Sequence, residues 1–258
     1  MLTTSLPPAT DTKRDEMQIT YGVGMNKERE FPERLKELIV RRGLKKICDV
    51  GGGANPILGL DFVRDHQLDY TVLDILASEL EKAPPGYKKI VADIADPKFS
   101  AEGQFDLVFS NMVAEHVKDG VQMHKNILRV LAPGGYSCHL FPTLYAFPFV
   151  FNRLFPETLT YKLLNILSPR DMYQRGKFPA YYSLCRGPSP QQLQRLESLG
   201  YEIVEYRGYF GNEGYYRWLP PLKLVNRFLW KYLLKHPMPF FTSYSCILLR
   251  KPLNVEKE

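Results

Sequence analysis

The stretch from Lys45 to Pro56 constrains the fold of this chain more than any other part of it. A short apolar run, Ile47 to Val50, holds an acid at position 49 and leads straight into three consecutive glycines. The run predicts a buried strand, and the glycines predict a tight turn where the backbone approaches a ligand closely, because no Cβ stands in the way. We therefore expect a ligand-binding loop at the end of this strand, with a plain structural turn as the alternative.

The residues around the turn restrict what the ligand can be. Side chains in place of Gly51 and Gly53 would fill the space where a ligand meets the main chain. A dinucleotide fingerprint requires a third glycine where this chain has Pro56, and its pyrophosphate would be repelled by Asp49. Asp49 can instead accept hydrogen bonds from a cationic or amino-bearing ligand.

The pattern acid-x-Gly-x-Gly of residues 49–53 resembles motif I of the class I S-adenosylmethionine-dependent methyltransferases. The third glycine of that motif is Asn55 here, and asparagine tolerates left-handed backbone better than most residues. Asp74 ends the second expected strand about twenty residues after the glycines, where an acid can hydrogen-bond both ribose hydroxyls. The resemblance implies that Asp93, at the end of the third, reaches the adenine amino group; a helix cap or turn is its alternative role. By this resemblance the cofactor S-adenosylmethionine is bound by Asp49, Gly51, Gly53, Asp74, Ile75, Asp93, Ile94 and Asn111.

Two later phrases extend the resemblance. Residues 105–111 predict a fourth strand, and the Glu-His-Val of residues 115–117 follows it, as in the small-molecule, type 11-like branch of the family. Asp119 opens a helix with a capping box, and the helix ends at the Leu-x-Pro-Gly-Gly turn of residues 131–135, another hallmark of the family. The chain is identified as a member of this family.

The order of the elements gives the expected fold class, which is α/β with a Rossmann-like, doubly wound, mostly parallel sheet of seven strands. The resemblance implies that the last strand lies antiparallel between the fifth and the sixth. Helices are expected at residues 31–42, 60–67, 119–131, 157–167, 189–199 and 222–234, and strands at residues 45–50, 70–74, 89–93, 105–111, 136–141, 201–207 and 241–250.

The sequence also predicts how the chain is divided. Residues 1–30 show no signal or transit pattern and are expected to be a flexible N-terminal segment, or the cover over the cofactor that the resemblance implies. Residues 31–258 are expected to form the methyltransferase domain. Its insertions, residues 143–187 and 208–240, fall at the ligand-binding edge of such a sheet, so we expect them to form a helical and aromatic lid over the acceptor.

The composition argues against several classes of protein. At 258 residues and 45% hydrophobic content the chain can bury a full core, and no apolar run approaches the ~20 residues that span a bilayer. The four cysteines are scattered without a CxxC pair, which argues against zinc and suits a reducing cytoplasm. The net charge of +6 is compatible with an anionic partner and equally with none.

The expected chemistry is methyl transfer from a sulfonium, which requires the acceptor to be held in line and water to be kept out. His116 is the best-placed general base for a hydroxyl acceptor, and the alternative is that it fixes the following loop. His139 is expected inside the core. Family members that bind a divalent metal use a Glu-x-x-Glu-His phrase, and Met112 replaces its first glutamate here, so we expect no catalytic metal. The (Asp/Asn)-Pro-Pro-aromatic motif of the amide and adenine N-methyltransferases is absent at residues 110–113, at the end of the fourth expected strand. This absence disfavours DNA adenine and glutamine as acceptors.

The acceptor is predicted from the aromatic residues of the two insertions, which would line an apolar pocket. These residues are Tyr145, Tyr181, Tyr182, Tyr209 and Trp218. They indicate a small hydrophobic or aromatic metabolite, as in secondary metabolism, with O-methylation ahead of N-methylation. The alternatives are a lipid-linked or cell-surface glycan, an RNA, and a cofactor-binding protein without turnover. Residues 222–235 predict a basic amphipathic helix, which either packs on the core or lies on an anionic membrane, making the protein peripheral to it.

Overall fold

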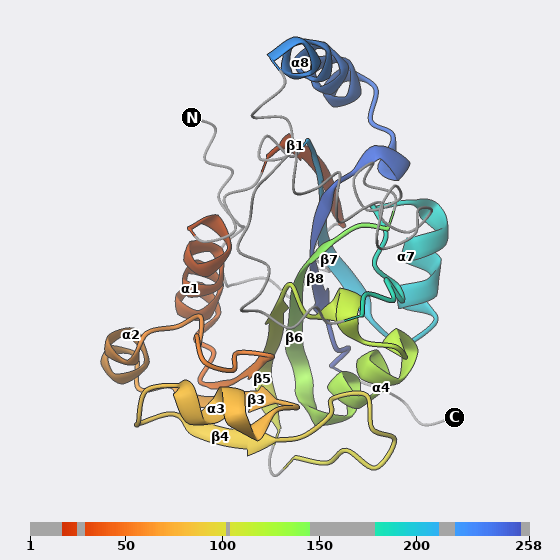
Figure 1. Cartoon of the computed structure of the whole chain (residues 1–258). Coiled ribbons are helices and arrows are strands. Elements are labelled where there is room, and N and C mark those ends of the chain that lie inside the picture. The colour runs from red at the N-terminus through yellow and green to blue at the C-terminus, as the bar shows by residue number, and fades with distance from the viewer. Residues whose placement is uncertain (1–16, 25–28, 102–103, 145–178, 212–219, 254–258) are drawn as a thin grey trace.

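A sheet of eight strands runs through the computed structural model of this protein (Figure 1). The structure describes residues 17–24, 29–101, 104–144, 179–211 and 220–253, and between residues 220 and 227 it describes the backbone only. The strands are β1 (Gln18–Val23), β2 (Lys46–Val50), β3 (Asp69–Asp74), β4 (Lys88–Val91), β5 (Phe105–Asn111), β6 (Leu131–Pro142), β7 (Glu202–Phe210) and β8 (Tyr244–Arg250). They lie in the order β1-β7-β8-β6-β5-β2-β3-β4.

All neighbouring strands pair in parallel except β8, which runs antiparallel to both β6 and β7. The expected Rossmann-like sheet is therefore confirmed, including the antiparallel strand inserted between two late parallel strands. The number of strands was wrong by one, because β1 adds an eighth strand at one edge.

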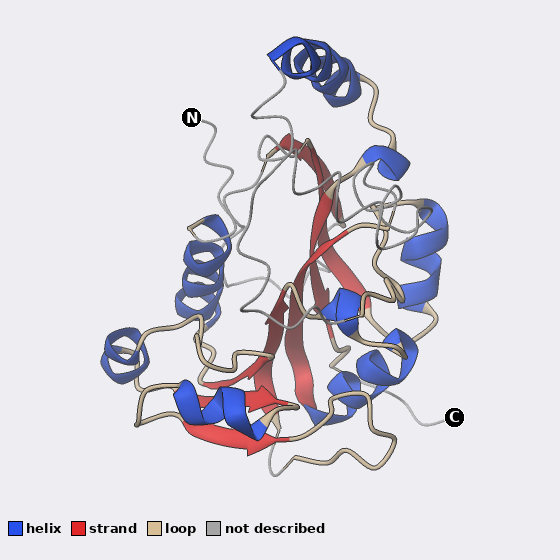
Figure 2. Cartoon of the chain, viewed as in Figure 1, coloured by secondary structure: helices blue, strands red, loops and turns tan. Residues whose placement is uncertain are grey.

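Helices cover both faces of this sheet, as Figure 2 shows in blue on either side of the red strands. The helices are α1 (Glu30–Arg42), α2 (Leu60–Asp65), α3 (Ala77–Lys82), α4 (Gly120–Val130), α7 (Pro190–Glu197) and α8 (Pro220–Lys235), with 3₁₀ turns η1 (Ala114–His116) and η3 (Pro239–Phe241). Apolar residues of α1, α2 and α3 share one cluster with the sheet, and those of α4 and α7 share another. The sheet is thus doubly wound.

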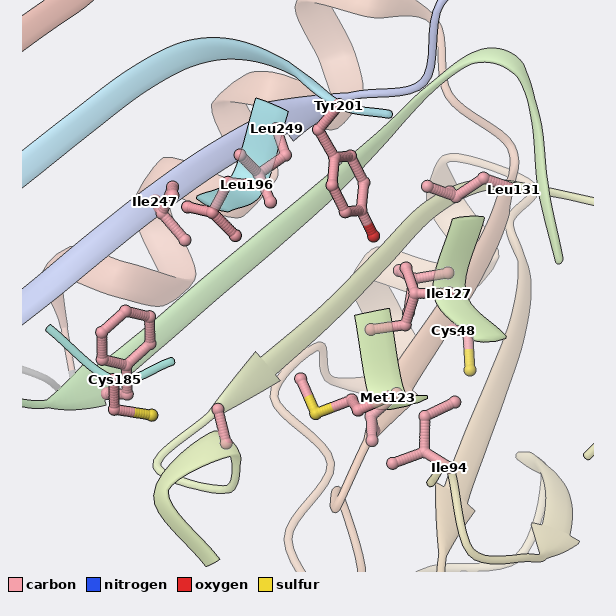
Figure 3. Packing of buried hydrophobic residues seen from close by; sticks show 14 of the residues in the cluster. Cys48, Ile94, Met123, Ile127, Leu131, Cys185, Leu196, Tyr201, Ile247 and Leu249 are labelled. Atoms are coloured by element: carbon pink, nitrogen blue, oxygen red, sulfur yellow. The ribbon is translucent and has the colours of Figure 1, made fainter. Parts of the chain in front are cut away.

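The two cores follow from the period of two in a strand, whose successive side chains point to opposite faces. In β5, Leu107 and Phe109 join the cluster under α1, whereas Val108 joins the cluster under α4. Figure 3 shows part of the second cluster, with Ile127 of α4 and Leu249 of β8 among its labelled residues. Strands that are apolar at consecutive positions are those covered on both faces, which is the pattern expected for a doubly wound sheet.

Strand β1 corrects the expectation of a flexible N-terminal cover. Residues 18–23 pair in parallel with β7, from Gln18 opposite Glu205 to Val23 opposite Phe210. The ring of Tyr21 stacks on that of Phe210 with the centroids 5.4 Å apart. This part of the chain is therefore an edge strand of the sheet, distant in strand order from the glycine turn that follows β2.

A buried carboxylate ties α1 to the same edge. Glu205 of β7 is buried and contacts the guanidinium groups of Arg34, from α1, and Arg207, from β7. Removing one partner of such a group leaves an uncompensated buried charge, which typically costs about 3–5 kcal/mol. The contact thus fixes the helix that precedes β2 against the far half of the sheet.

Several boundaries differ from the expected ones. β4 ends at Val91, so Asp93 lies in the following loop, and β8 begins at Tyr244 because η3 occupies residues 239–241. The helix expected at residues 157–167 lies outside the described residues. All four cysteines are buried and unpaired. Within the described ranges no helix combines the length and the apolar character that crossing a membrane requires.

Candidate active site

The acids and glycines that the sequence singled out meet at one edge of the sheet. β2 lies between β3 and β5, with Val50 opposite both Leu73 and Ser110. The carboxyl ends of three parallel strands therefore carry the glycine turn, Asp74 and Asn111 side by side. The chain leaves β2 toward β3 on one side and returns as β5 on the other, and such a switch point is where open α/β sheets bind ligands.

The glycine turn is packed against both neighbouring strand ends. Gly51 has φ +76° and donates its N–H to the carbonyl of Leu73 at 2.6 Å. A Cβ on Gly51 would lie 2.4 Å from Cγ2 of Val113, and a Cβ on Gly53 (φ +40°) would lie 2.9 Å from Oδ2 of Asp74. Both positions therefore require glycine for the backbone angle and for the close approach. Asn55, predicted as a left-handed substitute for the third glycine, does not have a positive φ.

Asp49 lies under the turn, where its carboxylate is almost entirely buried. Its Oδ2 accepts hydrogen bonds from the hydroxyl of Tyr70 at 2.6 Å and from the N–H of Ile57 at 3.0 Å. Burial raises the pKa of Asp49 to about 6; these two hydrogen bonds oppose the shift and the nearby charge of Asp74 adds to it. Asp49 thus ties the turn to β3 and to the loop that follows. Its negative charge lies behind the glycines, where burial makes the charged form unfavourable.

Tyr70 was not predicted to belong to the site. Its position inside a buried strand was the available signal, because a buried tyrosine hydroxyl nearly always finds a hydrogen-bond partner. Here that partner is the carboxylate of Asp49, 21 positions earlier in the chain.

Asp74 and Ile75 stand at the end of β3, beside the turn. Oδ1 of Asp74 accepts the N–H of Leu76 at 2.9 Å, which orients the carboxylate, and Oδ2 faces the glycine turn at Gly53. Ile75 is 57% exposed, so an apolar surface lies next to the acid. A carboxylate in this position can accept hydrogen bonds from the hydroxyls of a sugar ring, and an exposed aliphatic side chain beside it can pack on the face of a flat ring.

The loop after β4 is held by a residue that the sequence did not suggest. Asp93 is exposed and its Oδ1 accepts the N–H of Ala95 at 2.8 Å, so the turn role considered for it is present. Ile94 is buried. The side-chain amide of Asn126, fully buried in α4, donates to the carbonyls of Ile94 at 2.8 Å and Asp96 at 2.7 Å. An asparagine within the apolar stripe of a helix was the signal, because a buried amide requires partners.

The end of β5 carries two unusual features. Within the described residues, the buried Oδ1 of Asn111 has no hydrogen-bond partner. Met112 follows with φ +59°, a left-handed conformation that is uncommon for a bulky residue, and donates its N–H to the carbonyl of Leu140 at 2.8 Å. This strand end thus combines an unsatisfied polar atom with a strained backbone, two features that are common where a protein binds a ligand.

His116 lies in η1, immediately beyond this strand end, and its side chain is 37% exposed. Its Nδ1 is 2.9 Å from the carbonyl oxygen of Pro179. Because a carbonyl only accepts, Nδ1 carries the proton, and in the neutral ring Nε2 then carries the lone pair. Nε2 is 3.7 Å from Oε1 of Glu115, a buried carboxylate. The contact with Pro179 is the anchoring role considered for His116, and the geometry is also compatible with a base at Nε2.

The segment that returns from the first insertion is fixed on η1. The carbonyl of Glu115 accepts the N–H groups of Tyr181 at 2.7 Å and Tyr182 at 3.0 Å. Tyr181 is exposed, whereas Tyr182 adopts φ +54° and is buried. Among the described aromatic residues that were predicted to line the acceptor pocket, Tyr181 is thus the one that is exposed and bound to the neighbour of His116.

Tyr182 and Tyr209, the two other predicted pocket residues that the structure describes, are not brought together. Tyr182 belongs to the core cluster under α4 and Tyr209 to the cluster under α1, on opposite faces of the sheet. They therefore fill the two cores, Tyr209 through its position in β7 and Tyr182 through its left-handed backbone conformation. Tyr145 and Trp218 lie outside the described residues.

Two further histidines are structural. His139 is fully buried, as expected, with Nδ1 2.8 Å from Oγ of Ser110 and Nε2 2.5 Å from Oγ of Ser137. The ring of His124 meets it edge-on, with the centroids 5.4 Å apart. Burial lowers the pKa of both, that of His124 to about 4, so both rings are neutral inside the fold at neutral pH.

Two cavities within the described residues lie away from the glycine turn. One of about 450 Å³ is lined by Lys46, Asp69 and Lys88, at the amino ends of the strands and so at the opposite edge of the sheet. The other, about 320 Å³, lies between Arg186, Arg195 of α7 and Phe240 of η3. Neither contains the acids that the glycine turn brings together.

Comparison with known proteins agrees with this geometry. A family described as Methyltransferase domain matches residues 48–138, which run from β2 to β6 and include the glycine turn, Asp74, Asn111 and His116. A search of curated proteins found no match.

Solved structures match over most of the chain at low sequence identity. N-methyltransferase NodS from Bradyrhizobium japonicum WM9 is 16% identical, with 88% of this chain and 97% of that chain covered and a TM-score of 0.51. A putative sarcosine dimethylglycine methyltransferase from Galdieria sulphuraria is 12% identical, with 91% and 93% covered and a TM-score of 0.53. The [4+2]-cyclase SpnF is 16% identical, with 91% and 88% covered and a TM-score of 0.51. These similarities concern the fold, which carries more than one chemistry.

Proposed function

We propose that the chain is a class I S-adenosylmethionine-dependent methyltransferase and that it methylates an oxygen, or alternatively a nitrogen, of a small hydrophobic or aromatic metabolite. The proposed cofactor is S-adenosylmethionine, the methyl donor of that class. The residues at the sheet edge fit that cofactor, since the glycine turn, the charge of Asp49 and the unsatisfied oxygen of Asn111 suit a ligand that carries positive charge and hydrogen-bond donors.

One observation carries the choice of a hydroxyl acceptor. The carbonyl of Pro179 holds His116 in the tautomer whose Nε2 carries the lone pair, in the 3₁₀ turn that follows the carboxyl end of β5. A ring held in this way can take the proton of a hydroxyl acceptor at Nε2, and the adjacent carboxylate of Glu115 would stabilise the imidazolium that forms. A positioned general base contributes about 10²- to 10⁴-fold to the rate.

The remaining work of the chain is orientation. When bound, S-adenosylmethionine supplies a methyl group that is already electrophilic, so the chain has to align the acceptor and exclude water, which can supply about 7–11 kcal/mol. Asp74 is proposed to hold the ribose hydroxyls, and Ile75 to cover one face of the adenine. The exposed ring of Tyr181, whose backbone is bound to Glu115 next to His116, supports a flat or apolar acceptor.

The acceptor class can be tested directly. The protein, incubated with methyl-labelled S-adenosylmethionine and a fractionated extract of its source cells, is expected to transfer label to the fraction of small organic-soluble molecules. Label in RNA or in a lipid-linked glycan would replace the proposed acceptor with that class. Cofactor binding without label in any fraction would indicate a binding protein without methyl transfer. We propose that the enzyme works in the cytoplasm, where its buried thiols would stay reduced.

The role of His116 is separable from its contact with Pro179. Replacement of His116 with Ala removes both the base and the N–H donor, and is expected to lower kcat about 100-fold or more while leaving the dissociation constant of the cofactor unchanged. His116→Asn is the matched variant, because the Asn amide N–H can still donate to the carbonyl of Pro179. Equal loss in both variants supports the base, whereas normal turnover of His116→Asn would reduce the residue to an anchor.

A further inference from the structure

Helix α8 presents two different faces, and the inner one is anchored on the sheet edge. Trp230 and Leu233 are buried and cluster with Phe210 of β7 and Tyr21 of β1. Gly211, with φ +84°, lets the indole come so close that a Cβ on that glycine would lie 2.6 Å from it. The orientation of α8 about its own axis is therefore fixed by these contacts.

The outer face of α8 is aromatic and basic. Helical geometry places Phe228, Tyr232, Lys231 and Lys235 on the side opposite to Trp230 and Leu233. Phe228 is 66% exposed and Tyr232 is 54% exposed, and both lysines are exposed between and beside them. An amphipathic helix normally buries its aromatic residues against the core, so two large rings on the solvent side require another explanation.

The apolar surface continues beyond the helix. Met238, Phe240 and Phe241, in and beside η3, are each exposed by about half. Figure 1 shows α8 raised beyond one end of the sheet, with η3 at the same end of the molecule. We call the outer side of α8 together with these three residues the α8 face.

The chain segment that forms the α8 face carries charge of one sign. Residues 214–249 contain no Asp or Glu, and their basic residues are Arg217, Lys223, Arg227, Lys231 and Lys235. Exposed rings flanked by lysines match the interface of a bilayer, where the rings enter the acyl boundary and the ammonium groups reach lipid phosphates.

A second copy of the chain fits this surface less well. In a two-fold contact the α8 face would meet itself, so Lys231 and Lys235 would approach the same lysines of the other copy with no acid from this stretch between them. Lysine is also depleted in protein interfaces, whereas it is favoured at membrane surfaces.

We propose that the α8 face docks this protein on the surface of a bilayer that contains anionic lipids. The 16 residues of α8 would lie in the plane of the headgroups, with Phe228, Tyr232 and the side chains of η3 inserted and the lysines at the phosphates. Docking in this way does not require a particular acceptor. It would bring the carboxyl edge of an enzyme for hydrophobic acceptors next to the phase in which such molecules dissolve.

Vesicle flotation of the full chain tests the proposal without measuring methyl transfer. Vesicles of phosphatidylcholine with about 30% phosphatidylglycerol are expected to bind the protein at about 0.1 M salt, and pure phosphatidylcholine vesicles much less. Lys231→Glu with Lys235→Glu should reduce partitioning about tenfold or more, and Phe228→Ser with Tyr232→Ser should do the same. Because all four side chains are exposed, these variants should keep the thermal stability and cofactor affinity of the parent.

Lys98→Glu with Lys125→Glu is the control, since it makes the same change in net charge at exposed positions remote from α8. Equal loss of flotation in this control would overturn the proposal, because net charge alone would then explain binding. Absence of flotation by the parent protein at low salt would overturn it as well. A concentration-dependent dimer that Phe228→Ser dissociates would assign the α8 face to a second copy instead.

Discussion

Replacing Asp74 with Ala is expected to weaken binding of S-adenosylmethionine by about 100-fold or more. Hydrogen bonds to a charged acceptor contribute about 1.5–3 kcal/mol each, and the carboxylate at the end of β3 is proposed to accept two of them from the ribose. The side chain is oriented before any ligand arrives, because Oδ1 already accepts the N–H of Leu76 at 2.9 Å. The loss should therefore appear mainly in affinity, because the hydrogen bond to Leu76 that the variant also loses contributes only about 0.5–1.5 kcal/mol to folding.

Isothermal titration calorimetry with the cofactor measures this effect, and Asp69→Ala is its control. Asp69 begins the same strand at the opposite edge of the sheet, where it contacts Lys88 at 2.5 Å. Both side chains carry one negative charge and both lie at a strand end, so a difference between the variants reports position alone. An Asp74→Ala variant that binds like the parent would remove Asp74 from the ribose site and would require another acid to take that role.

The sequence allowed the sheet edge that carries the glycine turn, Asp74 and Asn111 to be predicted, because its signals are local. An apolar run that ends in an acid or in glycines identifies both the strand and its end, and parallel pairing then brings those ends together. Asp74 and Asn111 could therefore be placed beside the glycine turn without knowing any side-chain contact.

The parts that escaped prediction depend on contacts between distant residues. The hydrogen bond from Tyr70 to Asp49 and those from Asn126 to the loop after β4 join residues 21 to 32 positions apart, and periodicity says nothing about such partners. Strand β1 was missed for a similar reason. Its half-buried side chains give a weak pattern, and it becomes a strand because β7 offers an unpaired edge.

The aromatic residues of the acceptor prediction show the same limit. Composition assigned Tyr209 to a lid, but its position in β7 directs its side chain into the core under α1. Tyr182 enters the other core through a left-handed backbone that no propensity predicts for tyrosine. Aromatic content thus indicated neither which face a ring occupies nor whether it meets a ligand.

Replacing Asp49 with Asn is expected to stabilise the protein at neutral pH while weakening cofactor binding. Folding raises the pKa of this carboxyl from its ordinary value of 3.8 to about 6, mainly through burial. Between these values the folded chain keeps a proton that the unfolded chain has lost, so the free energy of unfolding falls as pH rises, by about 3 kcal/mol in total. The neutral Asn is free of this penalty, and its oxygen can still accept from Tyr70 and Ile57.

Denaturant unfolding of both proteins across pH tests the sign of this effect. The Asn variant should be more stable by up to about 3 kcal/mol above pH 6, and the difference should disappear below about pH 4, where the parent carboxyl is neutral in both states. Tyr70→Phe is the matched variant, because it keeps the charge and removes a donor, so it should destabilise by about 1–3 kcal/mol. An Asn variant that is less stable at every pH would mean that hydrogen-bond geometry, and not charge, determines the contribution of this residue.

The same variant links stability to function. The buried carboxylate of Asp49 lowers the stability of the ligand-free protein. Its presence is explained if it attracts a cationic ligand, because that attraction would offset the cost of burying the charge. We therefore expect Asp49→Asn to bind S-adenosylmethionine about tenfold more weakly, and the parent to bind it more tightly as pH rises through about 6. Because the pH dependence should be absent in the variant, it separates the charge of Asp49 from the structural role of the turn that it holds.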